Sequence, residues 1–482
     1  MSLTSALSTA QSALFNTSRR TDIVSRNISE ASNPDYARRS AALASSGDGA
    51  RITGIRRATD DALFRQNLSA LSQWSGQSVL SKGLDALQVR VNGVDNAGSP
   101  AAALTALQEA LQSYAATPAS QSAAQSVMEA ARGVVRSLNE GTATVQSFRA
   151  ELDREIATSV GELNRLLAEF EAANNEVVTG TRAGRDISDA LDRRDALLKD
   201  ISAYVPVSSV ARGDNDMMLV TGDGVTLFET VARTVTFSPN STYAPGMTGN
   251  AVYIDGVPLA AGSGGNTSAA GSLAANLQLR DTVAVQMQRQ LDETARGLIT
   301  AFAETDPSGT LADRTGLFTW PGGPALPAAA TLVDGLAGNI ALNTSFLADP
   351  GLLRDGGANG AGYVHNTEGG ASYADLLNAY LGKLDAPMSF DPAGGLEATQ
   401  SLNAFAGESI GWLESLRKDA ARGAQTKEAL ATHTQTVLSD ATGVNIDEEM
   451  SLLLDLENSY EASARLIATI DTMLSALMEA TR

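Results

Sequence analysis

The sequence has 482 residues, of which 43% are hydrophobic and 5% aromatic, with a formal net charge of −20 and no cysteine. This length exceeds one compact core, so we expect two to four domains, and the low aromatic content favours helices packed through small residues. The negative charge disfavours nucleic acid and anionic membranes as partners, and the lack of thiols excludes disulfides and thiolate metal sites.

The first predicted element is a helix with a heptad seam. Its seam positions are spaced alternately by four and three residues, and most are apolar: Leu3, Leu7, Ala10, Leu14, Thr17, Thr21, Val24 and Ile28. This spacing is typical of a coiled-coil helix. The helix should end before Pro34, because a residue that precedes proline is disfavoured in the α conformation.

Residues 60–203 are predicted to be helical with few breaks. The clearest helix covers residues 142–178, and at 1.5 Å per residue it would be about 55 Å long. Helical patterns return at 272–305 and 371–440. Long amphipathic helices bury their apolar faces against one another, so we expect a helical bundle in the form of a rod.

Residues 206–268 have β character. The stretch "MMLVTGDGVTLFE" consists of two apolar runs around a Gly-Asp-Gly turn, which predicts a hairpin, and "AVYIDGVPLA" contains an Asp-Gly turn. We interpret these residues as a small β domain inserted between helices. Residues 306–370 are rich in Gly, Pro and Ala with little periodicity, and we expect an irregular excursion there.

The last predicted element is a second coiled-coil helix that mirrors the first. Its apolar stripe, with spacings of three and four, comprises Ile446, Met450, Leu453, Leu456, Tyr460, Ser463, Ile467, Ile470, Leu474 and Leu477. Asn445 and Glu448 match a capping box, which predicts Asn445 as the N-cap. Asp447, Glu448 and Glu449 then lie at the positive end of the helix dipole, and this placement accounts for the acidic cluster without a catalytic or metal site.

No motif indicates catalysis, a cofactor or a metal. P-loop, G-x-S-x-G, H-E-x-x-H and Rossmann patterns are missing, and His365 and His433 are interpreted as surface residues. The tripeptide Arg212-Gly213-Asp214 occurs in adhesive proteins but also suits a simple turn. We expect neither a membrane span nor a Sec signal, since the sequence has no apolar run of about 18 residues and no basic, apolar leader.

Several stretches resemble the axial proteins of the bacterial flagellum, the family of rod, hook and hook-associated proteins. The resemblance at the first helix end is carried by Asn27, Ile28, Ser29, Asn33, Tyr36, Arg38 and Arg39. The stretch "GVNIDEEMSLLLDLENSYEASARLIATIDTMLSAL" is similar to the closing helix of the hook-associated members. Residues 191–207 and 272–304 resemble the first type of hook-associated protein, which joins hook to filament.

The resemblance implies a fold that is mainly α with a β insert. The terminal helices would form a coiled-coil inner domain that lines the channel of a tube, and the helical rod would form the next shell. The implied parts are the inner domain, an extended linker, the rod domain, a β-rich outer domain and an irregular excursion (1–34 with 442–482; 35–59; 60–205 with 269–305 and 371–441; 206–268; 306–370).

The resemblance also implies packing residues in place of catalytic ones. Subunit packing is expected through Leu3, Leu7, Leu14, Val24, Ile28, Ile446, Met450, Leu453, Tyr460, Ile467, Ile470, Leu474 and Leu477. Asn27, Asn33 and Pro34 would end the inner helix and turn the chain outward. Tyr36 would pack or hydrogen-bond at the bend, and Arg38 and Arg39 would pair with acidic neighbours.

The function implied is that of a structural subunit in the flagellum, outside the cell, joining hook to filament. The chain would be exported unfolded and would order when its seams are buried between identical subunits. Its partners would be copies of itself, the hook protein, an adjacent hook-associated protein or flagellin, and an export chaperone, with no cofactor and no enzymatic activity. The alternatives are another axial or filament-like subunit, a secreted adhesin that uses the β insert, and an exported hydrolase.

Overall fold

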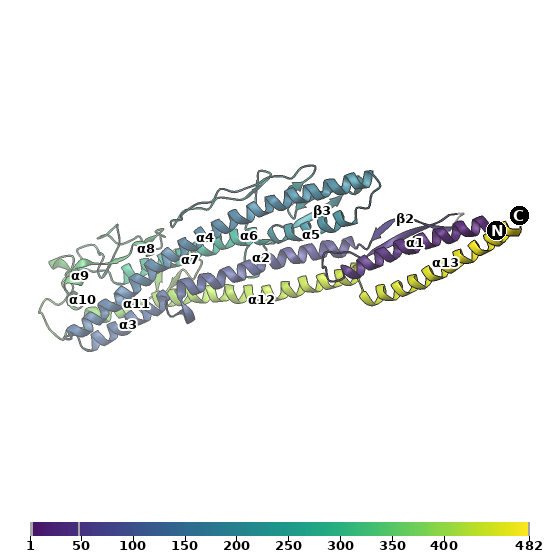
Figure 1. The fold of residues 1–482 in the computed structure, drawn as a ribbon. Coiled ribbons are helices and arrows are strands. Elements are labelled where there is room, and N and C mark those ends of the chain that lie inside the picture. The colour runs from purple at the N-terminus through teal and green to yellow at the C-terminus, as the bar shows by residue number, and fades with distance from the viewer. Residues whose placement is uncertain (1–2, 47–48, 481–482) are drawn as a thin grey trace.

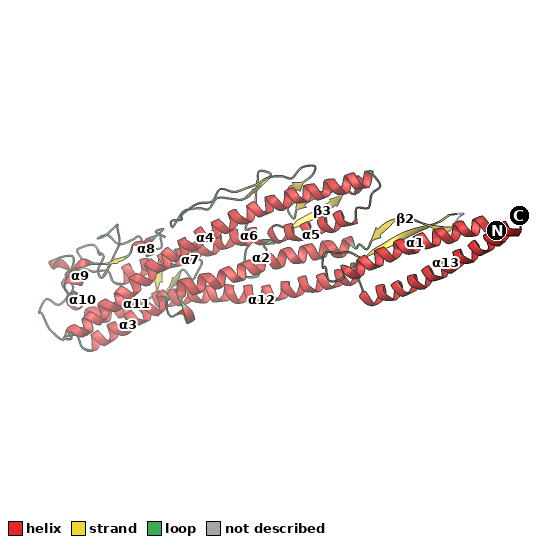
Figure 2. Cartoon of the chain, in the orientation of Figure 1, coloured by secondary structure: helices red, strands yellow, loops and turns green. Residues whose placement is uncertain are grey.

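The computed structural model describes residues 3–46 and 49–480, which form an elongated rod with both ends of the chain at one tip (Figure 1). Helices make up most of the described chain, and the strands are short (Figure 2). This confirms the predicted fold class, mainly α with a β insert. Residues 1–2, 47–48 and 481–482 of the predicted inner domain and linker lie outside the described residues.

The tip consists of a helix pair and a hairpin. Helix α1 (Leu3–Ser29) packs along α13 (Ile446–Ala480), and the pair extends beyond the rod (Figure 1). Strands β1 (Arg39–Ser46) and β2 (Gly49–Arg57) form an antiparallel hairpin that also contacts α1. In Figure 1, α1 runs between this hairpin and α13.

Long helices form the rod. They are α2 (Asp61–Asn92), α3 (Pro100–Ala116), α4 (Gln121–Arg182), α5 (Ser188–Tyr204), α7 (Ala284–Ala301) and α12 (Leu402–Thr442). The side chains of Asp60, Ser99, Ser120 and Ser401 cap the N-termini of α2, α3, α4 and α12. With 62 residues, α4 is longer than the predicted helix over 142–178, because Ser120 starts it in the preceding Ala-rich stretch.

The larger apolar core lies between α2, α3, α4, α7 and α12, where Leu84, Leu107, Val134, Leu291 and Leu413 are all buried. Residues 306–370 contribute to this same core through Leu317, Phe318, Leu336, Phe346 and Leu353. The segment contains the β9–β10 pair and three short helices: β9 (Phe318–Thr319), α8 (Leu336–Asn339), β10 (Ala341–Leu342), α9 (Thr344–Ala348) and α10 (Leu352–Asp355). It therefore covers the rod as part of its packing.

The β region forms a second core together with the ends of α4 and α5. Two three-stranded antiparallel sheets contribute to it: β3 (Val207–Ala211), β4 (Met217–Thr221) and β5 (Thr226–Phe228), and β6 (Val235–Thr236), β7 (Tyr253–Ile254) and β8 (Val257–Pro258). Leu219 and Phe228 pack against Leu163 and Phe170 of α4. The predicted hairpin is β4–β5, and the Asp-Gly turn joins β7 to β8.

A buried ionic cluster fastens the loop after β6 to the rod. It lies where α6 (Ser272–Gln278) passes through a π-helical turn (Leu279–Val283) into α7. Arg280, on that turn, is fully buried and pairs with the equally buried Asp153 of α4. Asp153 also accepts hydrogen bonds from Tyr243 Oη at 2.9 Å and from the backbone N–H of Asn240 at 2.5 Å.

A single carboxylate of α7 anchors residues 335–337. Asp292 accepts hydrogen bonds from the backbone N–H groups of Gly335, at 2.9 Å, and Ala337, at 2.8 Å. Burial raises the pKa of Asp292 to about 7, against the lowering effect of these hydrogen bonds. The remaining elements, α11 (Asp375–Asp385), β11 (Met388–Ser389) and β12 (Thr399–Gln400), lead into α12.

The first prediction concerns the ionic cluster. Asp153→Ala removes the fully buried carboxylate that pairs with Arg280 and leaves Arg280 only the partly exposed Asp281, so the free energy of unfolding should fall by about 3–5 kcal/mol. Urea denaturation followed by circular dichroism measures this change. Glu169→Ala, which removes a partner of Arg165 on the exposed face of the same helix, should cost less than about 0.5 kcal/mol. Equal losses in both variants would contradict the prediction.

The second prediction concerns pH. The pKa of Asp292 is higher in the folded chain than the usual value of 3.8, so the folded state holds a proton that the unfolded state releases between pH 4 and 7. The stability contributed by this group should therefore fall as pH rises, by about 1.4 kcal/mol per pH unit within that window. Urea denaturation at pH 5 and pH 7 should show this loss in wild type, and Asp292→Asn should lack it.

Candidate functional site: the joint between the terminal helices and the rod

The joint is where the chain leaves α1, turns through residues 30–38 and enters the hairpin. The start of α13 and the face of α5 meet it there. Within the described residues, this is where the terminal helix pair is tied to the rod by several ion pairs and buried hydrogen bonds. We therefore treat the joint as the candidate site, with mechanical coupling as its task.

Asn27 is the centre of the joint. Its amide is fully buried and uses all four of its hydrogen-bonding positions. The Nδ2 group donates to the backbone oxygen of Arg39 at 2.9 Å and to Oε2 of Glu449 at 3.0 Å. Oδ1 accepts from Tyr36 Oη at 2.9 Å and from the backbone N–H of Arg39 at 3.1 Å. One side chain of α1 thus binds the turn, the hairpin and α13 together.

Glu449 completes this link from the side of α13. Its carboxylate is buried, in the first turn of the helix, and accepts a hydrogen bond from Arg38 Nε at 2.6 Å as well as the one from Asn27. The positive end of the helix dipole favours a carboxylate in this position. Burial raises the pKa of Tyr36, so its hydroxyl stays protonated and continues to donate to Asn27.

Arginines of the hairpin fix the joint to α5. Arg39 pairs with Asp189 at 2.6 Å and with Asp192 at 2.7 Å. Arg57, on the paired position of the other strand, binds Asp192 at 2.6 Å and Asp195 at 2.5 Å. Burial acts to raise the pKa of Asp189, but the hydrogen bonds and charges of Arg39 and Arg26 together outweigh it and leave that pKa below its usual value. The Asp189 carboxylate therefore stays ionised at neutral pH.

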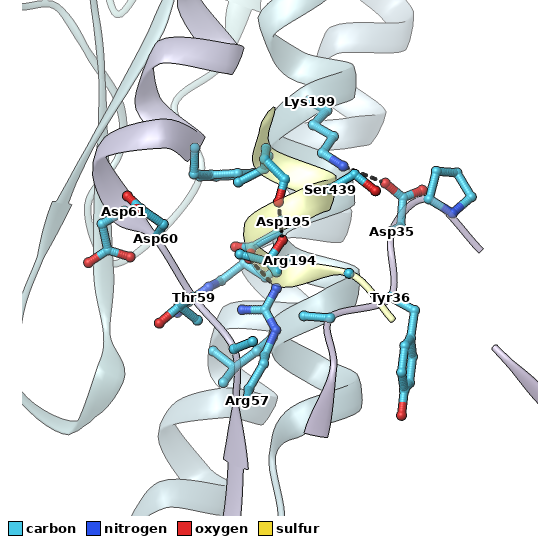
Figure 3. A pocket seen from close by; sticks show the side chains of 18 of the residues that line it. Asp35, Tyr36, Arg57, Thr59, Asp60, Asp61, Arg194, Asp195, Lys199 and Ser439 are labelled. Atoms are coloured by element: carbon cyan, nitrogen blue, oxygen red, sulfur yellow. Dashed lines mark hydrogen bonds and ion pairs between the residues drawn. The ribbon is translucent and has the colours of Figure 1, made fainter. Parts of the chain in front are cut away.

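A cavity of about 560 Å³ lies beside this ladder, between the turn, α2, α5 and the end of α12. Figure 3 shows Asp35 directed toward Lys199, and Arg57 directed toward Asp195. Asp35 and Lys199 are 2.8 Å apart and connect the turn to α5 a second time. The charged groups of these two pairs, which line the cavity, therefore neutralise each other within the joint.

The residues predicted to end α1 have unequal roles in the structure. The helix ends at Ser29, before both Asn33 and Pro34, which are exposed in the turn. Asn33 Oδ1 accepts from the backbone N–H of Asp35 at 3.1 Å, and its Nδ2 donates to Glu30. These bonds stabilise the turn locally. Tyr36, Arg38 and Arg39 lie in the joint itself, with the partners described above.

The predicted cap of α13 is present in part. Asn445 Oδ1 accepts from the backbone N–H groups of Asp447 at 3.0 Å and Glu448 at 3.3 Å, which makes Asn445 the N-cap. The Glu448 side chain lies 3.9 Å from Arg38 Nη1, beside the joint. It therefore adds charge next to the Arg38–Glu449 pair.

The predicted packing stripes are unevenly covered within one molecule. Val24 and Ile470 are buried, and a larger group is half-buried: Leu3, Leu7, Leu14, Ile28, Leu453, Ile467 and Leu474. The exposed members are Ile446, Met450, Tyr460 and Leu477. The face of α13 that α1 covers is centred on Glu449, Leu456 and Ile470, so the predicted stripe lies partly beside it.

The aspartates of α5 that pair with the hairpin arginines, and the role of Glu449, were not predicted from the sequence. Asp189, Asp192 and Asp195 are spaced by three residues, which places them on one side of a helix, and this spacing was the available signal. Glu449 lies seven residues before Leu456, within the buried register, although a helix-start carboxylate is usually exposed. A charged residue at a position that the helical repeat buries indicates that a specific group in the fold pairs with it.

Other candidate sites are occupied by structural contacts. Arg212 pairs with Asp216 at 2.8 Å, and Asp214 pairs with Arg182 at 2.8 Å, so the Arg-Gly-Asp turn is held to neighbouring elements. His365 Nε2 lies 3.0 Å from the backbone oxygen of Thr305. Across residues 3–46 and 49–480, no acidic or histidine cluster is arranged to hold a metal ion, and no helix has the length and apolarity needed to cross a membrane.

Two family models match the chain. Residues 91–318 match the flagellar hook-associated protein FlgK helical domain, and residues 439–480 match the C-terminal model of the flagellar basal body rod FlgEFG proteins. The second match covers α13 and the last turn of α12 before it. These matches identify the chain as an axial protein of the bacterial flagellum, located outside the cell.

Curated relatives carry the name flagellar hook-associated protein 1. The one from Salmonella typhimurium is 24% identical over 250 residues, 49% of this chain and 44% of the relative. The one from Bacillus subtilis is 23% identical over 424 residues, 82% of this chain and 78% of the relative. The match to the Salmonella protein thus spans less than half of that protein's length. Over these regions the chain is therefore similar to flagellar hook-associated protein 1.

One solved structure is also similar. The flagellar hook junction protein FlgK from Burkholderia pseudomallei matches with a TM-score of 0.42 and 19% identity, covering 53% of this chain and 46% of that chain.

The third prediction tests the joint. Asn27→Leu removes the hydrogen bonds that Asn27 makes to the Tyr36 hydroxyl, the Arg39 N–H and Oε2 of Glu449, each at a cost of about 1–3 kcal/mol. Amide hydrogen exchange over residues 446–456 should accelerate by about 100-fold in the full chain, as measured by mass spectrometry. Asn33→Ala, in the exposed turn, should change this exchange less than about threefold. Unchanged protection in Asn27→Leu would refute the central role of that amide.

Proposed function

We propose that this chain is a structural subunit that joins hook to filament, and that its terminal helices assemble with those of identical subunits. The observation that carries the proposal is the contrast between a completed rod and an incomplete helix pair. Both apolar cores consist of residues between Leu68 and Ala420, and neither contains a residue of α1 or α13. The pair instead leaves large apolar side chains exposed on its surface.

These exposed side chains occur on both helices of the pair. Phe15 of α1 is 62% exposed, and on α13 Met450, Leu454, Leu466 and Met473 are between 44% and 57% exposed. Apolar surface of this extent on a slender helix pair favours association, because burial of each such side chain contributes about 1.5–3 kcal/mol. Two helices with uncovered seams are marginal in isolation, so copies of the same pair are the partners that fit them.

The role assigned to the chain requires no catalysis. Its partners in this proposal are copies of itself, the hook protein on one side, and an adjacent hook-associated protein or flagellin on the other. An export chaperone would cover the seams of α1 and α13 before assembly. The chain would be exported unfolded, and the seams would order as they are buried, which offsets the conformational entropy of the terminal segments.

The fourth prediction tests the proposal by truncation. A chain that ends at Gly443 keeps both apolar cores and should retain the helical circular dichroism and thermal transition of the rod. In cells that lack the intact chain, it should leave hooks without filaments and release flagellin into the medium. Electron microscopy and immunoblotting of the medium measure these outcomes. Normal filaments on hooks that contain only the truncated chain would overturn the proposal.

A further inference from the structure

We propose that the basic outward face of the β1–β2 hairpin in one subunit binds the acidic outward stripe of α13 in the next subunit. This inference rests on the proposed function, since it names the surfaces through which neighbouring copies would meet. It is based on the charge, the exposure and the residue spacing of the outward faces of the hairpin and of α13, which the contacts of the joint do not use. Neither surface belongs to the apolar cores of the rod.

The hairpin has one face engaged and one face open. Its strands contain four arginines and no carboxylate. The cross-strand register, with its irregularity after Ala42, places Arg39 and Arg57 on the face that binds α5. Arg51 and Arg56 lie on the opposite face and are exposed, and neither forms an ion pair with a residue that the structure describes. A two-stranded hairpin is marginal in water by itself, so this face favours a partner.

Helix α13 presents a stripe with the opposite charge. The helix contains eight carboxylates and one arginine. On the side turned away from α1, spacings of three and four align five exposed residues: Asp447, Met450, Leu454, Glu457 and Glu461. Glu461 pairs with Arg465, whereas Asp447 and Glu457 have no ion-pair partner among the described residues. The stripe therefore offers two uncompensated carboxylates with apolar side chains between them.

The spacing of the charges matches on the two surfaces. Arg51 and Arg56 lie opposite Ala44 and Ser40, which are four strand positions apart on β1, or about 13 Å at 3.3 Å per residue. Asp447 and Glu457 are ten helical positions apart, about 15 Å at 1.5 Å per residue. A helix lying along β2 can thus form both arginine–carboxylate pairs at once. The cross-strand neighbours of the two arginines, Ala44 and Ser40, are small and allow close approach.

The two surfaces cannot meet within one molecule, because α1 runs between the hairpin and α13 (Figure 1). Contact between two different patches on identical subunits is heterologous and generates a ring or a helix. The contact also offsets repulsion between chains that each carry a net charge of −20, by placing basic surface against acidic surface. The occupant of the hairpin face is therefore a second copy of this chain.

Engineered cysteines test the contact directly, since the chain has none of its own. The Ala44→Cys/Leu454→Cys chain keeps every charge, and mild oxidation of isolated flagella should convert it into a ladder of covalent multimers. The matched control, Ala44→Cys/Ser459→Cys, places the second thiol on another side of α13 and should yield at least fivefold less multimer. Denaturing gels without reductant give the readout.

The outcomes separate this inference from the function on which it rests. A chain that is present in isolated flagella and stays monomeric, or that cross-links equally through both cysteine pairs, overturns the inference alone. Absence of the intact chain from the hook–filament junction overturns the proposed function and the inference with it.

A charge exchange provides the second test in the full chain. Arg51→Glu/Arg56→Glu should lower incorporation into flagella by at least tenfold, with unchanged circular dichroism because neither arginine forms an ion pair with a described residue. Adding Glu457→Arg should restore at least a third of the incorporation. Asp455→Arg, an equal charge change on another side of α13, should not restore it. Equal effects of the two additions would count against the contact.

Discussion

The buried amide of Asn27 sets the relation between the two parts of this molecule. Its side chain hydrogen-bonds the turn after α1, the backbone of the hairpin and the first turn of α13. A buried amide with four partners tolerates little change in their positions, because each lost bond leaves a desolvated polar group. The direction in which the helix pair leaves the rod therefore depends on this residue and on Glu449, its partner in α13.

Charged groups at the joint favour a defined angle over maximal stability. A buried ion pair is often no more stabilising than an apolar contact of the same size, but its geometry is directional. Arg39 and Arg57 bind three carboxylates of α5 through planar guanidinium groups, and Arg38 holds Glu449. The proposed assembly of identical copies requires the same angle in every copy, and a ladder of short, directional contacts provides that uniformity better than interchangeable apolar packing.

Periodic features of the sequence predicted the architecture, whereas individual contacts between residues far apart in the chain could not be predicted. The heptad seam from Leu3 to Ile28, the cap at Asn445 and the Asp-Gly turn between β7 and β8 are local patterns with local causes. Residues 306–370 lack such a pattern, because their order comes from distant groups such as Asp292 and from burial in the rod core. Likewise, nothing within α13 identifies the arginine that meets Glu449, since Arg38 lies at the other end of the chain.

The difference between local and long-range contacts implies an order in which the parts of the chain fold. The rod is complete in its own apolar cores, whereas the pairing of α1 with α13 requires contacts between the first and last thirty or so residues of the chain. Closing such a long loop is favourable only once the rod has brought the start of α2 and the end of α12 together, where both line the cavity at the joint. The terminal helices are then the last part to order, and their uncovered side chains are presented on a rod that is already rigid.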